Sequence, residues 1–295
     1  MASKASPTYF GRPRSVISAE LKPTEKVVCP LCQLVPRPFA VDYQGFQLVH
    51  CQNCGLQFVS PRLSFEQLAD KVYTETYFAM AGDATAENEA DGYQIARQLS
   101  NYERLLGRRG KVLDIGCGNG AFLRQAQKQG WEIFGTDIRL SNAARELDRP
   151  LWEGRLEEIN FGNERFDVVR FNHVLEHTQN PLEELRLSRD LLRPNGIIHI
   201  SVPNIAGLSP RLKSLQSRLR LKRHRWRHYA AMHHLFFWSP KTLRAFTEGA
   251  GLKVVLWETP VPRKAHQHSL TEKVYRLVLE NSRSASILDF YCTLS

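Results

Sequence analysis

The sequence contains no long hydrophobic run. None of its segments approaches eighteen uninterrupted apolar residues, about the length that a helix needs to cross a bilayer. The N-terminal stretch "MASKASPTYFGRPRS" is positively charged, but no apolar segment follows it, so it does not match a secretory signal. We therefore expect a cytoplasmic protein whose contact with a membrane, if it has one, is peripheral.

The sequence also has few acidic residues and no internal repeat. It contains 30 Asp and Glu against 40 Lys and Arg, a formal net charge of +10. This surplus favours an anionic partner such as nucleic acid, a lipid headgroup surface or a phosphorylated substrate, without choosing among them. The length of 295 residues and the 42% hydrophobic content suit one full-sized globular domain with a smaller module.

Four of the six cysteines form two C-x2-C pairs. Cys29 and Cys32 make the first pair, and Cys51 and Cys54 make the second, with eighteen residues between the two pairs. Two such pairs can supply the tetrahedral four-sulfur shell of a structural Zn²⁺, which leaves no open position for catalysis. Two disulfides, or four ordinary buried cysteines, are the alternatives, and the absence of a secretion signal disfavours disulfides.

Most of the chain after residue 110 alternates between strand patterns and helix patterns. The successive segments are "KVLDIG", "AFLRQAQKQG", "EIFGTDI", "SNAARELDR", "FDVVRFN", "PLEELRLSRDLLRPNG" and "IIHISVP". Alternation of this kind predicts an α/β fold, with a parallel sheet covered on both faces by helices and a ligand at the carboxyl ends of the strands.

These patterns predict a division of the chain into successive parts. A Ser-, Pro- and base-rich tail comes first, then the zinc module, a helical lid or linker, the main domain with a basic helical insertion, and a C-terminal helix and strand. The predicted bounds of these parts are 1–25, 26–62, 63–108, 109–265 with the insertion at 207–232, and 266–295.

The stretch "VLDIGCGNG" combines an acidic strand end with a glycine-rich turn. Gly116, Gly118 and Gly120 form G-x-G-x-G, which differs from the G-x-G-x-x-G of dinucleotide-binding folds. Asp114 precedes them, and a carboxylate there would repel a phosphate and attract an ammonium group. The next strand ends at Asp137, where a carboxylate can accept both hydrogen bonds of a ribose diol. Together these residues imply a nucleoside with a cationic amino-acid tail.

The sequence resembles the class I S-adenosylmethionine-dependent methyltransferases. The likeness runs through "VLDIGCGNG", "GTDI", "FDVVRFNHVLEH" and "LRPNGIIHISVPN", and "HHLFFWSPKTLRAFTEGAGLKVV" extends it. It implies a Rossmann-like sheet with helices on both faces, preceded here by the zinc module, and S-adenosylmethionine as cofactor. By motif, the three glycines would cradle the methionine part and Asp114 would hold its amino group directly or through water. Asp137 would bind the ribose hydroxyls, with Ile138 beside it.

Two further cofactor contacts follow from the same resemblance. Asn172 falls where the family places a residue beside the methionine part, and Leu156 falls near the adenine. Many members carry Asp where Arg155 stands here, so the resemblance leaves the adenine contact open.

The zinc module carries a resemblance of its own. "CPLC…CQNCGLQFVSPRLSFEQL…VYTETYF" looks like the N-terminal part of bacterial methyltransferases of sugar, cell-envelope and natural-product pathways, including deoxysugar C-methyltransferases. Those sugar enzymes commonly carry an added C-terminal domain, so C-methylation of a nucleotide sugar is one candidate among several. In this resemblance Tyr73 and Tyr77 would help to close the pocket, unless they only pack a helix.

The motif "NHVLEH" holds the candidates for catalysis. Methyl transfer from a sulfonium needs alignment and, for many acceptors, one general base. His177 is the first candidate with Glu176 orienting it, followed by His173 and His234, with His233 less favoured. Helix capping is the alternative role. The H-x-x-E-H pattern of a zinc peptidase is discounted because the motif begins at a strand end. Ubiquinone-pathway O-methyltransferases have Glu in place of His173 and can bind Mg²⁺, so a catalytic metal stays open here.

Residues 209–228 form a basic segment with eight Lys or Arg among leucines. Leu212, Leu215 and Leu219 would share one face of a helix. Such a helix can rest on an anionic membrane, grip phosphates, or simply be solvated. RNA binding would be favoured by aromatic residues interleaved with the basic ones, and only one Trp and one Tyr stand nearby.

These observations predict a methyltransferase that acts on a small molecule, a saccharide or a lipid-linked envelope precursor. An RNA methyltransferase is the alternative in the same class, because a zinc ribbon and basic charge would suit it. A non-catalytic protein that keeps the cofactor fold is the alternative of a different class.

Overall fold

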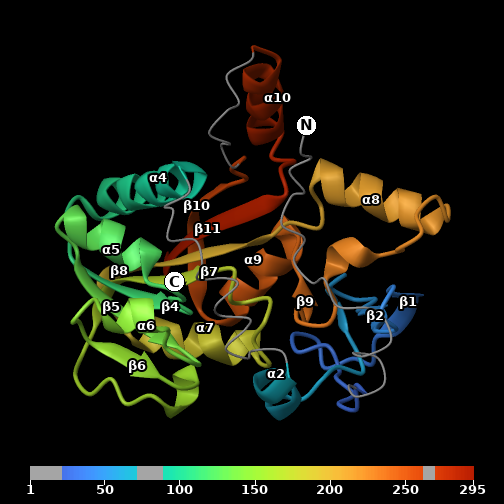
Figure 1. Cartoon of the computed structure of the whole chain (residues 1–295), viewed down its shortest axis with the longest axis horizontal. Coiled ribbons are helices and arrows are strands. Elements are labelled where there is room, and N and C mark those ends of the chain that lie inside the picture. Colours follow the sequence, from blue (N-terminus) through green and yellow to red (C-terminus); the bar gives the residue numbers. More distant parts are fainter. Residues whose placement is uncertain (1–21, 72–88, 262–269) are drawn as a thin grey trace, which may run out of the picture.

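The structure, a computed structural model, describes residues 22–71, 89–261 and 270–295. Figure 1 shows a large sheet with helices on both sides and, beside it, a smaller sheet that contains the N-terminal strands. The predictions for Tyr73 and Tyr77, and most of the predicted tail, lie outside the described residues.

The large sheet has seven strands in the order β10-β11-β8-β7-β4-β5-β6. Neighbouring strands from β8 to β6 pair in parallel, whereas β11 is antiparallel to both β8 and β10. The α/β fold class is therefore confirmed, and the last strand of the chain completes the sheet. The strands are β4 (Lys111–Ile115), β5 (Glu132–Asp137), β6 (Leu151–Glu153), β7 (Phe166–Asn172), β8 (Leu192–Pro203), β10 (Leu252–Glu258) and β11 (Ile287–Leu294).

The helices that cover the sheet pack apolar side chains against it. In α5 the residues Phe122, Leu123 and Ala126 are buried, and this helix packs with α4 against one face. Helices α7 and α9 pack together on the other face, and α9 starts with a capping box from Ser239 to Thr242. The helices are α4 (Glu89–Leu106), α5 (Ala121–Lys128), α6 (Asn142–Arg145), α7 (Pro181–Asp190), α8 (Leu208–Arg218), α9 (Pro240–Gly249) and α10 (Leu270–Asn281).

The small sheet joins the N-terminal segment to a distant part of the chain. Its order is β1-β2-β3-β9, and Phe58 of β3 pairs with Phe236 of β9 across 178 positions of sequence. Both phenylalanines are buried, and they belong to the same hydrophobic core as the strands β7 and β8. The N-terminal segment is thus packed onto the main sheet. The elements are β1 (Arg37–Val41), β2 (Gln47–His50), β3 (Gln57–Val59), β9 (Phe236–Phe237) and the following helix α2 (Phe65–Lys71).

A buried ion pair lies in the middle of the large sheet. Asp114 of β4 is directly opposite Arg170 of β7, and Asp114 Oδ1 lies 2.6 Å from Arg170 Nη1. Arg170 also donates to Gln98 Oε1 at 3.1 Å, and its guanidinium lies 4.0 Å from the Phe122 ring centroid. Because both charges are almost fully removed from water, each depends on the other for compensation.

We expect Arg170→Met to lower the free energy of unfolding by about 3–5 kcal/mol, because it leaves the Asp114 carboxylate buried without a counter-charge. The double variant Arg170→Met with Asp114→Asn should recover part of this loss, since no charge is then left unpaired. Denaturant titration of both variants provides the measurement. A loss below about 1 kcal/mol in the single variant would show that water or another cation compensates Asp114.

Candidate active site

A cavity of about 400 Å³ opens at the carboxyl ends of β4, β5 and β7. The chain runs from β4 to β5 and β6 on one side, and from β7 to β8 on the other, so the cavity lies where the strand order reverses. Ligands of open α/β sheets bind at this switch point, and the volume is in the range of small-molecule sites. The wall also includes η1 (Leu156–Glu158), the start of α7, and Phe65 of α2.

The loop after β4 has a shape that requires glycine. Gly116 and Gly120 have φ values of +70° and +77°, and a Cβ on Gly116 would meet Val174 Cγ2 at 2.4 Å. Gly118 has φ +56° with open space where its Cβ would be, and it lines the cavity. Side chains would therefore strain this turn, and their absence leaves the backbone free to approach a ligand closely. This fits a cofactor that runs along the loop, as predicted for S-adenosylmethionine.

Asp137 ends β5 at the edge of the same cavity. Its carboxylate accepts hydrogen bonds from the backbone N–H groups of Gly118 at 2.9 Å and Arg139 at 3.3 Å. Burial raises the pKa of Asp137 to about 6, although these N–H groups act in the opposite direction. The loop and the carboxylate thus hold each other in place beside the cavity.

The other predicted cofactor residues fall into two groups. Ile138 and Leu156 line the cavity together with Gly116, Gly118 and Asp137. The remaining three, Asp114, Gly120 and Asn172, are not among its lining residues.

Two members of this second group, Asp114 and Asn172, have hydrogen-bond partners inside the protein. The Asp114 carboxylate is paired with Arg170, and Asn172 Oδ1 accepts from Gln98 Nε2 at 3.3 Å. The resemblance implies that Asp114 holds the amino group of the cofactor directly or through water, and in the structure this carboxylate is paired with Arg170.

Four histidines gather where β7 leads toward α7. His173 and His177 line the cavity, and the His177 ring lies 4.7 Å from that of His234 and 5.4 Å from that of His233, centroid to centroid. The His177 Nδ1 atom is 2.9 Å from the His233 carbonyl oxygen, so we assign it as a donor, which leaves Nε2 as the acceptor in the neutral ring. Burial lowers the pKa of His177, of His234 and of His233, the last to about 3. These three rings are therefore neutral near pH 7.

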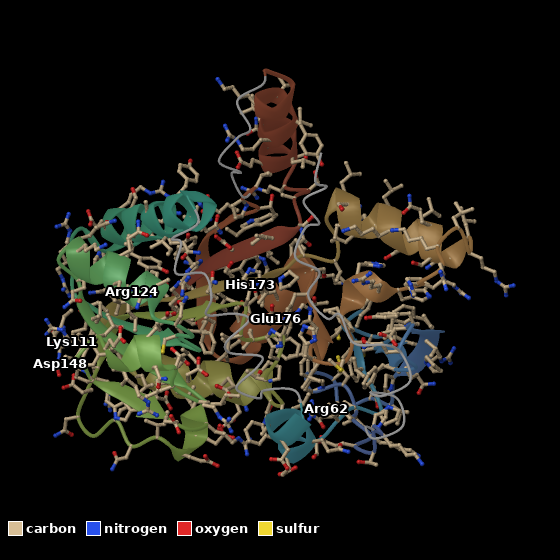
Figure 2. All side chains as sticks on the ribbon, viewed as in Figure 1. Arg62, Lys111, Arg124, Asp148, His173 and Glu176 are labelled. Atoms are coloured by element: carbon tan, nitrogen blue, oxygen red, sulfur yellow. The ribbon has the colours of Figure 1, made fainter. Side chains whose placement is uncertain are left out.

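Glu176 lies next to this group and is fully buried. Its Oε1 atom is 3.3 Å from His173 Nδ1, and its Oε2 atom has no hydrogen-bond partner among the described residues. The structure thus places Glu176 beside His173, whereas the atom that orients His177 is the His233 carbonyl oxygen. Figure 2 shows His173 and Glu176 near the centre of the molecule. Glu176, His177 and His234 also offer ligand atoms within 4.8 Å of one another, a spacing that suits a metal ion.

Sequence reasoning missed several residues of the cavity. Phe65 enters from α2, and its ring lies 4.6 Å from the Arg155 guanidinium. Glu184 enters from α7, and burial together with the neighbouring Glu157 raises its pKa to about 7. Neither residue belongs to a recognisable motif. The adjacent acids Glu183 and Glu184 in the first turn of α7 were a sequence signal that could have indicated a polar site there.

The four cysteines of the two C-x2-C pairs come together at one point. Their sulfur atoms lie within 4.8 Å of one another, and those of Cys29 and Cys54 are 3.6 Å apart. The two turns share one geometry, because Gln33 and Gly55 each adopt a positive φ and donate their N–H to the carbonyl of the first cysteine. None of the six cysteines forms a disulfide in the structure. A tetrahedral zinc site has sulfur atoms about 3.8 Å apart, so the donor set fits Zn²⁺.

Comparison with known proteins agrees with this geometry. A methyltransferase domain family matches residues 88–256. The ubiquinone biosynthesis O-methyltransferase of Aliivibrio fischeri is 26% identical over 157 residues, which cover 48% of this chain and 61% of that protein. The same enzyme of Histophilus somni is 33% identical over 107 residues, which cover 32% and 45%. The chain therefore spans at most about three fifths of the length of these relatives.

Solved structures show the same fold at low identity. The 1,6-didemethyltoxoflavin-N1-methyltransferase of Burkholderia thailandensis, solved with 1,6-didemethyltoxoflavin and S-adenosylhomocysteine, aligns with a TM-score of 0.56 at 17% identity. The alignment covers 88% of this chain and 99% of that one. The mitomycin 7-O-methyltransferase MmcR aligns with a TM-score of 0.53 at 16% identity, over 79% and 61% of the two chains.

The family match extends over more than half of the chain, and the sheet, the glycine loop and the cavity at the switch point lie where the resemblance predicted them. The chain belongs to the methyltransferase domain family and has the fold of a class I S-adenosylmethionine-dependent methyltransferase.

Proposed function

We propose that this protein transfers a methyl group from S-adenosylmethionine to a small molecule, a saccharide or a lipid-linked precursor. One observation carries the proposal: a single cavity is lined both by the glycine loop with Asp137 and by His177. A cofactor site and a candidate base thus share one space. The relatives support a small acceptor, because their names refer to ubiquinone biosynthesis, toxoflavin and mitomycin. The resemblance of the zinc module to enzymes of sugar and envelope pathways supports the narrower class.

In this proposal the cofactor lies along the carboxyl ends of β4 and β5. Gly116 and Gly118 would face its methionine part, Asp137 its ribose, and Ile138 and Leu156 its adenine side. Asp114 would not contact the cofactor directly, because its carboxylate is paired with Arg170. Glu184 is a candidate acceptor for the adenine amino group, since the stretch around Arg155 lacks the Asp that many members carry.

The cofactor supplies an activated methyl group on its sulfonium, and the protein must align the acceptor and receive a proton. We infer that His177 takes the proton, because it lines the cavity and its Nδ1–H is bonded to the His233 carbonyl, which leaves Nε2 to act as the base. A metal ion held by Glu176, His177 and His234 is the alternative device for activating the acceptor.

The first of three predictions about the proposed function and its metal concerns the ribose contact. Asp137→Ala should weaken S-adenosylmethionine binding by about 1.5–3 kcal/mol, because charge-assisted hydrogen bonds to the ribose are lost. Only the ionised carboxylate makes such bonds, and its pKa is raised to about 6, so wild-type affinity should fall as the pH is lowered through about 6. Isothermal calorimetry between pH 5 and 8 measures both effects.

The matched control for this prediction is Asp137→Asn, which keeps the shape and removes the charge. Its affinity should be low and should no longer change across this pH range. An unchanged dissociation constant in Asp137→Ala would mean that the ribose lies elsewhere.

The second prediction concerns the zinc site. Purified protein should contain about one zinc per chain, and Cys29→Ser with Cys51→Ser should remove it and loosen the small sheet. Elemental analysis measures the metal, and the absence of zinc from untreated protein would refute the site. A second metal that persists in the cysteine variant would instead support a metal at Glu176, His177 and His234.

The third prediction concerns the base. His177→Ala should leave cofactor affinity nearly intact and lower turnover by about 10²- to 10⁴-fold, the usual contribution of positioned proton transfer. His234→Ala is the comparison, because a residue that only orients the acceptor should raise KM as well as lower kcat.

Initial rates on the identified acceptor, corrected for folded fraction by circular dichroism, separate the two roles. If His177 only supports the local structure, the variant should lose about 1 kcal/mol of stability while turnover per folded molecule stays nearly the same. Full activity in His177→Ala would remove this residue from the reaction.

A further inference from the structure

Helix α8 presents its leucines to solvent. Leu208, Leu212, Leu215 and Leu219 follow one another at intervals of four, three and four residues, which aligns them in one stripe. Each of the four is between 51% and 58% exposed. Figure 1 shows α8 at the upper right, extending away from the large sheet. A surface helix ordinarily turns such a stripe toward the core. In α8 the apolar face points to solvent instead.

Polar side chains fix the orientation of α8. Ser217 is buried, and its Oγ accepts a hydrogen bond from the N–H of Trp226 at 3.0 Å. Ser214 Oγ lies 2.9 Å from His228 Nε2. Trp226 is itself buried, with its ring 5.9 Å from that of Phe39 in β1. Turning the leucines inward would break these contacts. The leucines are therefore exposed as a consequence of how the helix is packed.

The surroundings of the stripe are strongly basic. Residues 208–227 contain eight Lys or Arg, and no Asp or Glu occurs anywhere between residues 191 and 247. Seven of the eight basic side chains are exposed: Arg211, Lys213, Arg218, Arg220, Arg223, Arg225 and Arg227. The partner of this surface must therefore accept both apolar side chains and a dense positive charge.

Each of two other partners would match only one of these two properties, the apolar stripe or the positive charge. A second copy of the chain could cover the leucines, but it would bring two basic helices together. RNA could neutralise the charge, but the leucines would stay in water, and the nearby aromatic rings of Trp226 and Tyr229 are buried and unavailable for base stacking.

We propose that residues 208–227 dock this protein on the surface of an anionic lipid bilayer. The leucine stripe would lie at the boundary between headgroups and acyl chains, with the arginines on the lipid phosphates. Among residues 22–71, 89–261 and 270–295, none of the helices has the length and hydrophobicity of a membrane-spanning segment. The proposal goes beyond methyl transfer and does not depend on it.

Cosedimentation of the full chain with lipid vesicles tests the proposal. We expect binding to phosphatidylcholine vesicles that contain about 30% phosphatidylglycerol, and at least about tenfold weaker binding to pure phosphatidylcholine or in about 0.5 M salt. Equal binding to both kinds of vesicle, or no binding to either, would overturn it.

A triple variant tests the role of the stripe. Leu212→Ser with Leu215→Ser and Leu219→Ser should weaken binding to the anionic vesicles by about 100-fold, because half-buried leucines no longer enter the bilayer. Its affinity for S-adenosylmethionine should equal that of the wild type, which shows that the variant is folded and separates this test from that of the methyltransferase.

Helix α10 offers the matched control. Val274, Leu277 and Val278 are also more than half exposed, but the acidic and basic residues of this helix balance each other. Replacing these three by Ser should leave vesicle binding unchanged. Retained binding in the α8 variant, a leucine-dependent dimer without lipid, or RNA binding in place of vesicle binding would each contradict the proposal.

Discussion

The hydrogen bond between the Gly118 N–H and the Asp137 carboxylate is the contact on which the site depends. It joins the turn after β4 to the end of β5, and thereby helps to fix the alternating glycines Gly116, Gly118 and Gly120, all of which have a positive φ. A side chain at Gly116 would collide with Val174, so the same turn also sets the path of the chain after β7. The glycine loop and the turn that carries His173 and His177 are therefore packed against each other, and both line one cavity.

The small sheet and the segments that flank it are hydrogen-bonded to the turn after β7, part of which lines the cavity. Strand β9 completes the small sheet, and the segment just before β9 carries His233 and His234. The N–H of Leu235 donates to the Glu176 carbonyl at 2.7 Å, which ties this segment to the turn after β7. Arg62, just before α2, donates to the Gln179 carbonyl at 2.9 Å. A zinc site that stabilises the small sheet would thus support the wall of the cavity as well as its own module.

The alternating strands and helices, the switch-point cavity and the meeting of four cysteines were all predictable from the sequence, because each depends on local periodicity or on a short motif. The pairing of Asp114 with Arg170 was not predictable from the sequence. It follows from the register of β4 against β7, which no local pattern reveals. The pairing of a two-residue strand, β9, with β3 is too short to leave a periodic signal. The stripe of Leu212, Leu215 and Leu219 was predictable as a helix face, but its outward orientation depends on Ser214 and Ser217, which hold the opposite face.

The central claim is that one cavity binds S-adenosylmethionine and passes its methyl group to a small acceptor. Incubating the protein with cofactor labelled in the methyl group and a fractionated cell extract, then following the label, tests this claim most directly. We expect the label to enter the small-molecule or lipid-extractable pool, and the transfer at a limiting cofactor concentration to fall when Asp137 is replaced. Label found only in RNA, or cofactor binding without transfer to any pool, would contradict it.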